Sequence, residues 1–313
     1  MPPLITTRSF PVRFYECDAY AHLNNTVYAR YMQETAFAAS IEAGYPHDWY
    51  AANNRAFLTR SSYIEFIKPV LYGDTVHVTA WVDMLRRVLA RRRYEIRSHN
   101  TGELMCRAHT NWVFVDVAAN RPVAMPPEIQ QRFSATAAER AWISAQNLAS
   151  IEAPYTPPPV PLQPELPERP FTVRRNVIFA DIDQQQHVNN AVYMDYCEEA
   201  GFEASASFGW PPARSIAAGW ATLFRQVWIE YLQPAMLGDE LEITAWLSDL
   251  KRVSAYRHFR ITRVSDGVIL ARMTAQLAFV SLRSGLIARL PPEVHMDFAR
   301  HVSIARQTGE LPF

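Results

Sequence analysis

The chain of 313 residues has few cysteines, no net charge and no long apolar run. Lysine plus arginine and aspartate plus glutamate number 31 each, so no global field draws the protein to nucleic acid or to an anionic membrane. No stretch approaches the roughly 20 apolar residues that a membrane span requires. We therefore expect neither a nucleic-acid partner nor a membrane partner.

Cysteine occurs only at Cys17, Cys106 and Cys197, without metal-ligand spacing. We interpret each as a small core residue in a reducing, cytoplasmic protein. The start, MPPLITTRSF, lacks the charged and apolar regions of a secretion signal. No glycine-rich phosphate loop, HExxH or paired CxxC is present, so the sequence implies no metal and no cofactor.

An internal repeat is the strongest feature that is present. VRFYECDAYAHLNNTVYARYMQETAF starts at Val12, and VIFADIDQQQHVNNAVYMDYCEEAGF starts at Val177, a shift of 165. IEFIKPVLYGDTVHVTAW and IEYLQPAMLGDELEITAW, from Ile64 and Ile229, keep the same shift. With 49% hydrophobic and 20% charged residues, this is a globular chain built from two copies of one domain.

A proline-rich stretch, 153–170, separates the copies. Proline favours extended backbone, so we expect a semi-rigid surface spacer that crosses the face of a domain. The predicted domains are therefore 1–152 and 171–313.

The sequence of each copy predicts an opening strand, a loop, an apolar helix and several long strands. We expect opening strands over 12–16 and 177–180, and helices that start near Asn24 or Asn25 and near Asn189 or Asn190. Gly44-Tyr45-Pro46 and Gly209-Trp210-Pro211 are the helix stop signals. The expected later strands are near 62–70, 75–84, 90–98 and 103–116, and near 227–235, 240–249, 255–263 and 268–281. One apolar helix before an antiparallel strand run predicts an α+β fold, a sheet wrapped around a buried helix.

The pattern D-x-x-x-H-x-N-N-x-x-Y marks the strand-to-helix junction of both copies. Its residues are Asp18, His22, Asn24, Asn25 and Tyr28, and then Asp183, His187, Asn189, Asn190 and Tyr193. With this order of elements, the chain resembles the hot-dog thioesterases of the 4-hydroxybenzoyl-CoA thioesterase superfamily. DIDQQQHVNN also resembles the acyl-ACP thioesterases, which are tandem hot-dogs. The resemblance implies two hot-dog domains in tandem, and a pseudo-dimer formed within one polypeptide.

The motif suits thioester hydrolysis. An aspartate is ionised at neutral pH, so Asp18 or Asp183 can serve as nucleophile or as a base on water. The N–H groups and the dipole at the helix start can stabilise an oxyanion. We assign substrate contacts to the four asparagines. His22 and His187 are candidate catalytic residues. The apolar stripe of each helix is the candidate wall of an acyl tunnel.

Structural interpretations stay open for the same residues. The aspartates could brace their loops, the histidines could bond neighbouring carbonyls, and the asparagines could only cap the helices. Tyr28 and Tyr193 fit a core or tunnel wall better than a catalytic role. Glu34 and Glu199 lie on an apolar helix, where a carboxylate needs a partner.

The copies differ at one position of the loop. Gln185 lies between Asp183 and His187, where the acyl-ACP thioesterases carry a catalytic asparagine, and the first copy has Tyr20 there. We therefore expect the second copy to be the more active one, with Gln185 as a candidate catalytic residue.

Arginines cluster on two predicted strands and invite comparison with the phosphates of coenzyme A. Arg87 and Arg252 share the shift of 165 and are the better candidates for phosphate contacts. The other basic residues of the two clusters are Arg86, Arg91, Arg92, Arg93, Lys251, Arg257 and Arg260. Charges on exposed strand faces often serve solvation alone, and such a surface could also meet an acidic carrier protein.

These features favour a cytoplasmic, cofactor-free hydrolase of acyl-CoA or acyl-ACP. A hot-dog dehydratase or hydratase is the closest alternative, although the His-Asn-Asn helix start fits it less well. A non-catalytic module that binds acyl thioesters is the alternative from another class.

Overall fold

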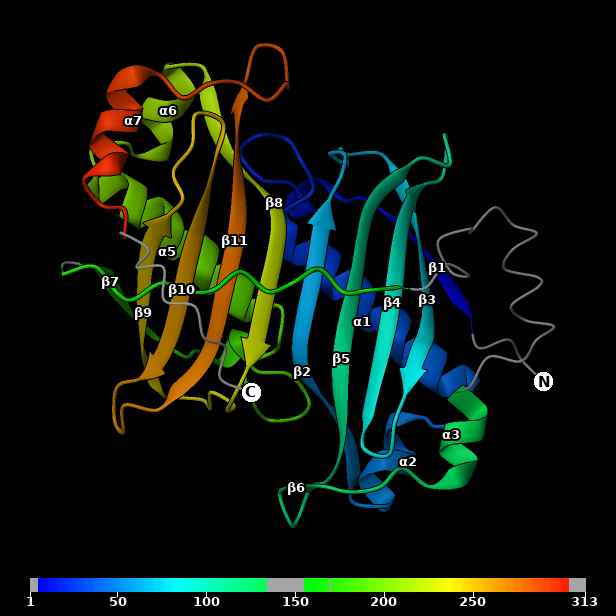
Figure 1. The fold of residues 1–313 in the computed structure, drawn as a ribbon. Coiled ribbons are helices and arrows are strands. Elements are labelled where there is room, and N and C mark those ends of the chain that lie inside the picture. Colours follow the sequence, from blue (N-terminus) through cyan, green and yellow to red (C-terminus); the bar gives the residue numbers. More distant parts are fainter. Residues whose placement is uncertain (1–4, 134–154, 169, 304–313) are drawn as a thin grey trace. The chain divides into compact units, whose positions relative to one another are not determined.

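The computed structural model describes residues 5–133, 155–168 and 170–303, in two compact units (Figure 1). They divide between Pro159 and Val160, inside the proline-rich spacer. Residues 153, 154 and 169 of the predicted spacer lie outside the described residues, so its limits stay a prediction. Matching elements follow one another in the same order in both units, so the repeat in the sequence is a repeat in the structure.

In the first unit, an antiparallel sheet has the order β1-β3-β4-β5-β2. Its strands are β1 (Thr6–Pro11), β2 (Arg55–Phe66), β3 (Thr75–Leu85), β4 (Leu89–Ser98) and β5 (Leu104–Asp116), and the short β6 (Arg121–Pro122) pairs with β5. The helices are α1 (Asn25–Glu42), α2 (His47–Ala52) and α3 (Pro127–Phe133), and a 3-10 turn, η1 (Phe14–Glu16), follows β1. The long α1 packs against β1 and β3 on one face of the sheet (Figure 1).

The second unit repeats this arrangement with the order β7-β9-β10-β11-β8. Its strands are β7 (Phe171–Asn176), β8 (Trp220–Tyr231), β9 (Glu240–Ser248), β10 (Ser254–Arg263) and β11 (Ile269–Ser281). Its helices are α5 (Val192–Ser207), α6 (Pro212–Ala217) and α7 (Pro292–Ala299), with the 3-10 turn η2 (Phe179–Asp181) after β7. α5 packs against β7 and β9, as α1 does against their counterparts.

Alternation along the strands explains why each sheet covers a helix. Val76, Val78 and Ala80 of β3 are fully buried, because every second side chain points to the helix side of a strand. The stripe predicted for the first helix is buried from Val27 to Thr35. The predicted fold, a sheet around a central helix, is therefore confirmed in each unit.

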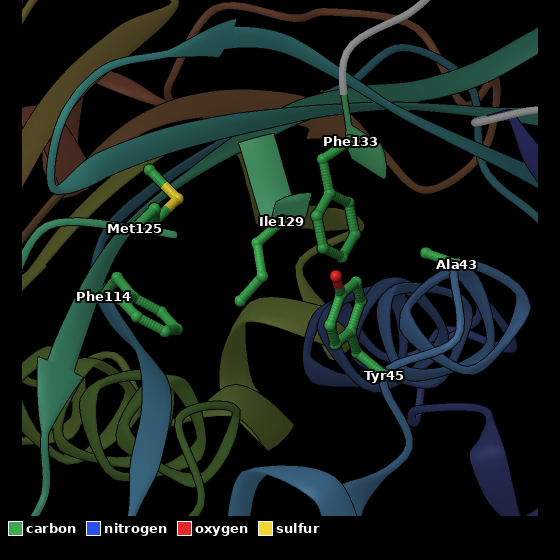
Figure 2. Packing of buried hydrophobic residues seen from close by; sticks show 6 residues of the cluster. All are labelled: Ala43, Tyr45, Phe114, Met125, Ile129 and Phe133. Carbon is green, nitrogen blue, oxygen red and sulfur yellow. The ribbon is translucent and has the colours of Figure 1, made fainter. Parts of the chain in front are cut away.

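Glycine ends both central helices, as the stop signals predicted. Gly44 and Gly209 have φ of 92° and 91°, left-handed values that suit glycine after a helix. The chain then turns into an apolar cluster at the far end of α1 (Figure 2). Its buried members are Ala43, Tyr45, Phe114, Met125, Ile129 and Phe133. The cluster anchors the end of α1 that lies away from the motif loop.

Four strand predictions were wrong in position or at a boundary. The opening strands end at Pro11 and Asn176, before the predicted ranges, and 3-10 turns occupy 14–16 and 179–181. Glu16 causes the first of these turns, because its carboxylate accepts a hydrogen bond from the Arg13 N–H at 2.9 Å. The strands β2 and β8 begin seven residues before their predicted starts at 62 and 227.

The spacer lies on the sheets. In the first unit it crosses the face opposite α1 (Figure 1), and the Tyr155 hydroxyl is 2.7 Å from Nδ1 of His109. In the second unit, the Gln163 amide donates to the Met273 carbonyl at 3.1 Å. The described part of the spacer is therefore hydrogen-bonded to both units. No helix of the described residues has the length and apolarity to span a bilayer.

Candidate active site

Asp18 organises the loop between η1 and α1. Its Oδ1 accepts hydrogen bonds from the backbone N–H groups of Tyr20, at 2.8 Å, and His22, at 3.1 Å. Its own N–H donates to the His22 carbonyl at 2.8 Å. The loop closes so tightly that Ala21 adopts a φ of 62°.

Asp183 organises the corresponding loop in the second unit. Its Oδ1 accepts from the Gln185 N–H at 2.8 Å, and Gln186 has the left-handed φ of 63°. Its Oδ2 accepts from the Asn189 side-chain amide at 3.2 Å. Asp183 is therefore held through both oxygens.

The first asparagine of the motif is the N-cap in the first unit only; the N-cap of α5 is Ala191, so the expected cap at Asn189 or Asn190 was wrong. Asn24 is the N-cap of α1, and its side-chain oxygen accepts from the Thr26 N–H at 2.9 Å. Asn189 accepts from the Ala191 N–H at 2.9 Å in the same way, although α5 begins two residues later in its motif, at Val192. The N-cap prediction is confirmed for Asn24, and the carboxylate loops lead directly into the positive ends of the central helices.

The second asparagines lie in the first turn of the helix region. Asn25 begins α1 and is partly buried. The carbonyl of Asn190 accepts a hydrogen bond from the Tyr231 hydroxyl at 3.0 Å. Phe66 is the counterpart of Tyr231, so this brace belongs to the second unit alone.

The histidines of the motif lie partly exposed beside the aspartates. Nδ1 of His187 is 3.2 Å from the Val188 carbonyl. A carbonyl only accepts, so Nδ1 is the donor of this contact.

Tyr28 and Tyr193 are core residues that brace the loop. The Tyr193 hydroxyl accepts from the Ala235 N–H at 2.9 Å, and the Val70 N–H donates to Tyr28 in the equivalent place. Burial raises the pKa of both phenols, that of Tyr193 to about 12. Both therefore stay protonated near neutral pH, and they tie each central helix to the turn that follows β2 or β8.

Two acidic residues that the sequence did not single out bind tyrosines of the central helices. Glu16 accepts a hydrogen bond from the Tyr31 hydroxyl at 2.6 Å, and Asp181 accepts from the Tyr196 hydroxyl at 2.6 Å. These contacts fasten η1 and η2 to the central helices. The signal was available, since both acids lie two residues before the motif aspartate and both tyrosines share the shift of 165.

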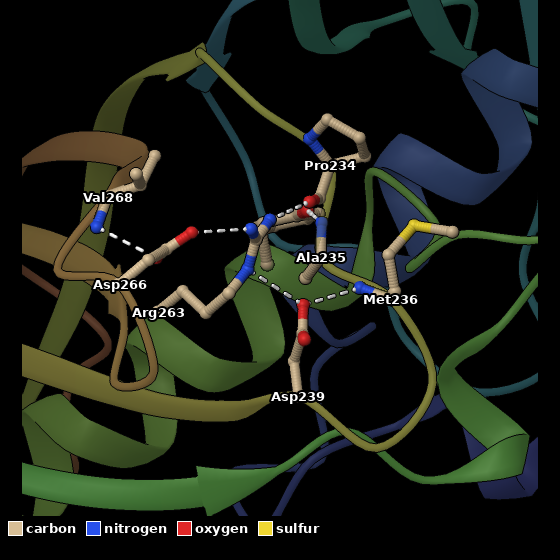
Figure 3. A network of polar contacts seen from close by, with 8 residues as sticks. Pro234, Ala235, Met236, Asp239, Arg263, Asp266 and Val268 are labelled. Carbon is tan, nitrogen blue, oxygen red and sulfur yellow. Dashed lines mark hydrogen bonds and ion pairs between the residues drawn. The ribbon is translucent and has the colours of Figure 1, made fainter.

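An arginine braces the neighbouring turn in the second unit only (Figure 3). Arg263 donates to Asp239 at 3.1 Å and to the Pro234 carbonyl at 2.9 Å. Asp239 in turn accepts from the Met236 N–H at 2.9 Å. The counterpart of Arg263 is Ser98, so the equivalent turn of the first unit lacks this guanidinium.

Comparison with known proteins identifies the family. The model of the thioesterase-like superfamily matches residues 12–133 and 177–306, one match in each repeat and together more than half of the chain. The chain belongs to the thioesterase-like superfamily.

Curated relatives of this thioesterase-like protein match parts of it. The palmitoyl-acyl carrier protein thioesterase of Arabidopsis thaliana is 24% identical over 207 residues, 63% of this chain and 47% of its own length. The long-chain acyl-CoA thioesterase FadM of Escherichia coli is 35% identical over 106 residues, 33% of this chain and 77% of its own. The chain thus spans about half the length of the plant relatives that it matches.

Solved structures share the fold. A 12:0-ACP thioesterase from Umbellularia californica is 16% identical with a TM-score of 0.68, over 90% of this chain and 99% of that one. An acyl-ACP thioesterase from Bacteroides thetaiotaomicron is 15% identical with a TM-score of 0.65, over 88% and 98%. The predicted tandem of hot-dog domains is confirmed.

The candidate phosphate residues of this thioesterase-like protein lie away from the motif of their own unit. Arg87 follows β3, whereas the loop adjoins the start of β3 through the Val12 N–H, which donates to Asp74. The start and the end of β3 are separated by its eleven residues, which corresponds to about 35 Å at 3.3 Å per residue. Arg252 follows β9 in the same way, so neither unit brings its exposed arginine to its own aspartate.

Several other arginines already have partners. Arg91 donates to Asp83 through Nε at 2.8 Å and through Nη2 at 3.0 Å. Arg93 lies over the rings of Trp81 and Tyr155. Arg92 is buried and donates to the Ala36 carbonyl of α1 at 2.7 Å. These three arginines stabilise the first unit.

In the second unit, Arg257 repeats the contact of Arg92 and donates to the Gly201 carbonyl of α5. Burial lowers its pKa to about 10. Arg260 is half-buried near the Trp246 ring.

Two remaining expectations need correction. Glu34 and Glu199 are exposed, because they lie on the side of the central helices that faces away from the sheet, and no buried partner is needed. Cys106 and Cys197 are buried as predicted, but Cys17 is only partly buried. Among the described residues, no three side chains of histidine, cysteine, aspartate or glutamate form a metal-binding group.

Proposed function

We propose that this protein hydrolyses acyl thioesters of coenzyme A or of an acyl carrier protein to the free acid and thiol. The observation that carries this proposal is the twice-built loop in which an aspartate precedes the N-terminus of a central helix. The relatives named above, which act on acyl-ACP or acyl-CoA, support the substrate class.

The chemistry follows from the groups at the loop. The aspartate either attacks the thioester carbonyl itself or takes a proton from an attacking water. Negative charge then develops on the carbonyl oxygen, where the positive end of the helix stabilises it. When water attacks, collapse of the tetrahedral intermediate breaks the C–S bond and releases the free acid, and the thiolate takes up the proton that the aspartate accepted from the water. When the aspartate itself attacks, the same cleavage leaves a mixed anhydride on its carboxylate; a water then hydrolyses this anhydride, which releases the free acid, restores the aspartate and supplies the proton of the thiol.

We propose that the second unit carries the higher activity. Asp183 is held through both oxygens, and Gln185 places an amide in the loop where the first unit has Tyr20. An amide can position the water or the carbonyl, whereas a phenol fills more space.

Thiol release from a panel of acyl-CoA and acyl-ACP substrates tests the proposal. We expect the Asp18→Asn plus Asp183→Asn double variant to lose at least about a hundredfold in kcat/KM, since removal of a nucleophile or base has effects of this size. Loss confined to Asp183→Asn would support the second unit as the active one. Turnover of an enoyl thioester without thiol release would indicate a dehydratase, and tight binding without any turnover would indicate a binding module.

Three accompanying proposals concern the setting of this activity. The duplication supports a pseudo-dimer formed by the two domains of one polypeptide. Further oligomerisation would join several such polypeptides. Free thiols at all three cysteines support a cytoplasmic location. Arg87 and Arg252, both exposed, remain candidates for contacts with coenzyme A phosphates or a carrier protein. Charge reversal at both positions is expected to raise KM without lowering kcat.

A further inference from the structure

Each unit exposes an apolar surface beside its motif loop, which we name the apolar platform. In the first unit it comprises Phe14, Tyr15, Leu71 and Tyr72, and in the second Ile178, Phe179, Met236 and Leu237. Phe14 is 78% exposed, Tyr15 77% and Phe179 82%. Soluble proteins rarely expose several large apolar side chains together unless these have a binding role.

The platform of the first unit is continuous with the aspartate loop. The rings of Phe14 and Tyr72 meet edge to face, with centroids 5.6 Å apart. The backbone N–H of Tyr72 is also hydrogen-bonded to the thiol of Cys17, the residue next to Asp18. Two turns, η1 and the turn after β2, thus present one surface within a few residues of the reacting carboxylate.

In the second unit, hydrogen bonds fix the turn that carries two residues of the platform. The Val188 N–H in the motif loop donates to the Ala235 carbonyl at 2.9 Å, which joins the loop to the turn that carries Met236 and Leu237. Arg263 and Asp239 brace the same turn (Figure 3). Such turns can hold apolar side chains in solvent without collapsing onto the sheet.

The charges around the platforms are already engaged. Arg13 pairs with Glu16 at 3.3 Å, and Asp74 accepts a hydrogen bond from the Leu71 N–H at 2.9 Å. Ile178 stands at the position of Arg13 in the second unit, which makes that platform more apolar still. These surfaces offer little to a phosphate or an acidic helix, and they match a hydrocarbon chain.

We infer that each platform is a subsite for the acyl chain of the thioester, and this inference rests on the proposed function. The chain lies across the exposed side chains while its carbonyl reaches the aspartate loop. The first platform is mainly aromatic, whereas the second is mainly aliphatic. The two units therefore differ in the acyl groups that they hold best.

Chain-length dependence of the kinetics tests this subsite. The variants are Phe14→Ser plus Tyr72→Ser in the first unit, and Phe179→Ser plus Leu237→Ser in the second, alone and combined. Each methylene that loses its apolar contact lowers kcat/KM about fourfold. We expect the combined variant to lose at least about tenfold with palmitoyl-CoA and less than about twofold with butyryl-CoA.

Exposed apolar residues elsewhere provide the matched controls. Val117→Ser in the first unit and Leu286→Ser plus Ile287→Ser in the second remove side chains of comparable exposure, far along the chain from the motif. These variants are expected to hydrolyse every chain length like the wild type. Equal losses at all chain lengths, or no loss, in the platform variant would overturn the inference.

Binding separates failure of the subsite from failure of the proposed function. Non-hydrolysable S-alkyl-CoA thioethers of increasing length are titrated calorimetrically. If the wild type hydrolyses nothing yet binds longer thioethers more tightly, and the platform variant loses this dependence, the subsite stands without the hydrolase. An effect seen only with carrier-protein substrates, at every acyl length, would make the platform a protein-docking surface instead.

Discussion

Ala21 and Gln186 are the residues at which the motif loop is most strained. Both have left-handed φ, 62° and 63°, although neither is a glycine. This conformation costs an L-residue about 1 kcal/mol or more, and such strain often persists where function requires a loop shape. Here the shape allows one aspartate oxygen to accept backbone N–H groups that lie two and four residues ahead of it.

Glycine at position 21 should relieve this strain. We expect Ala21→Gly to raise the free energy of unfolding by up to about 1 kcal/mol, because the folded-state strain outweighs the extra freedom of unfolded glycine. Ala21→Val should lower it by more than about 1 kcal/mol, because β-branched residues tolerate this conformation worst. Urea denaturation measures both.

Ala19→Gly is the control for this pair, since Ala19 is exposed and does not have positive φ. There glycine only gains freedom in the unfolded chain and should lower stability slightly. Equal destabilisation by Ala19→Gly and Ala21→Gly would contradict the strain argument.

At the scale of elements, the start of each central helix contributes both to the stability of the fold and to the proposed reaction. The cap at Asn24 satisfies an N–H group that the helix leaves without an internal partner. The same helix end supplies the positive potential on which the proposed mechanism depends. The sequence predicted this cap because capping is a local pattern of residues.

Asn24→Ala is expected to lower the free energy of unfolding by about 1 kcal/mol, since alanine cannot accept the Thr26 N–H. Asn24→Asp should retain the stability, because its carboxylate accepts the same bond and favours the helix dipole. Thermal and urea denaturation of the two variants provide the comparison. A loss with Asn24→Asp as large as that with Asn24→Ala would show that another contact of Asn24 is the important one.

Strand boundaries were harder to predict than the helix start. Phe14 and Tyr15 are typical strand residues, yet they are exposed in the turn that Glu16 closes locally, and the contact between Glu16 and Tyr31 holds this turn against α1. That contact joins residues 15 positions apart through a helix that must already be in place. A local propensity argument has no access to it.

At the scale of the whole molecule, each unit has a histidine beneath the docked spacer, although the two histidines do not occupy equivalent positions of the repeat. His109 bonds the Tyr155 hydroxyl directly, and Nδ1 of His258 lies 3.0 Å from Thr274, to which the Gln163 amide donates. Burial lowers the pKa of both histidines to about 4, with Arg91 and Arg93 adding to the effect at His109 and Asp249 opposing it at His258. Both imidazoles are therefore neutral in the folded protein near pH 7.

These histidines should make stability fall in mild acid. Their folded pKa values lie below the usual value of 6.5, so the unfolded chain binds protons first as the pH falls from 6.5 towards 4. Each histidine should remove about 2 kcal/mol of stability between pH 7 and pH 5. Urea denaturation of His258→Gln against wild type at both pH values checks this, and a pH dependence that the variant leaves unchanged would contradict it.

The amino-acid sequence alone determined the duplication, the central helices with their stops, the cap of α1, and the aspartate loops. These are patterns of neighbouring residues, and they repeat at one fixed shift. Only the tertiary structure decided that Arg92 stabilises a helix, that Arg87 lies far along the sheet from Asp18, and that Phe14 stays exposed beside the loop. Those outcomes depend on which distant segments meet when the sheet closes around its helix, and residue spacing along the chain does not encode such meetings.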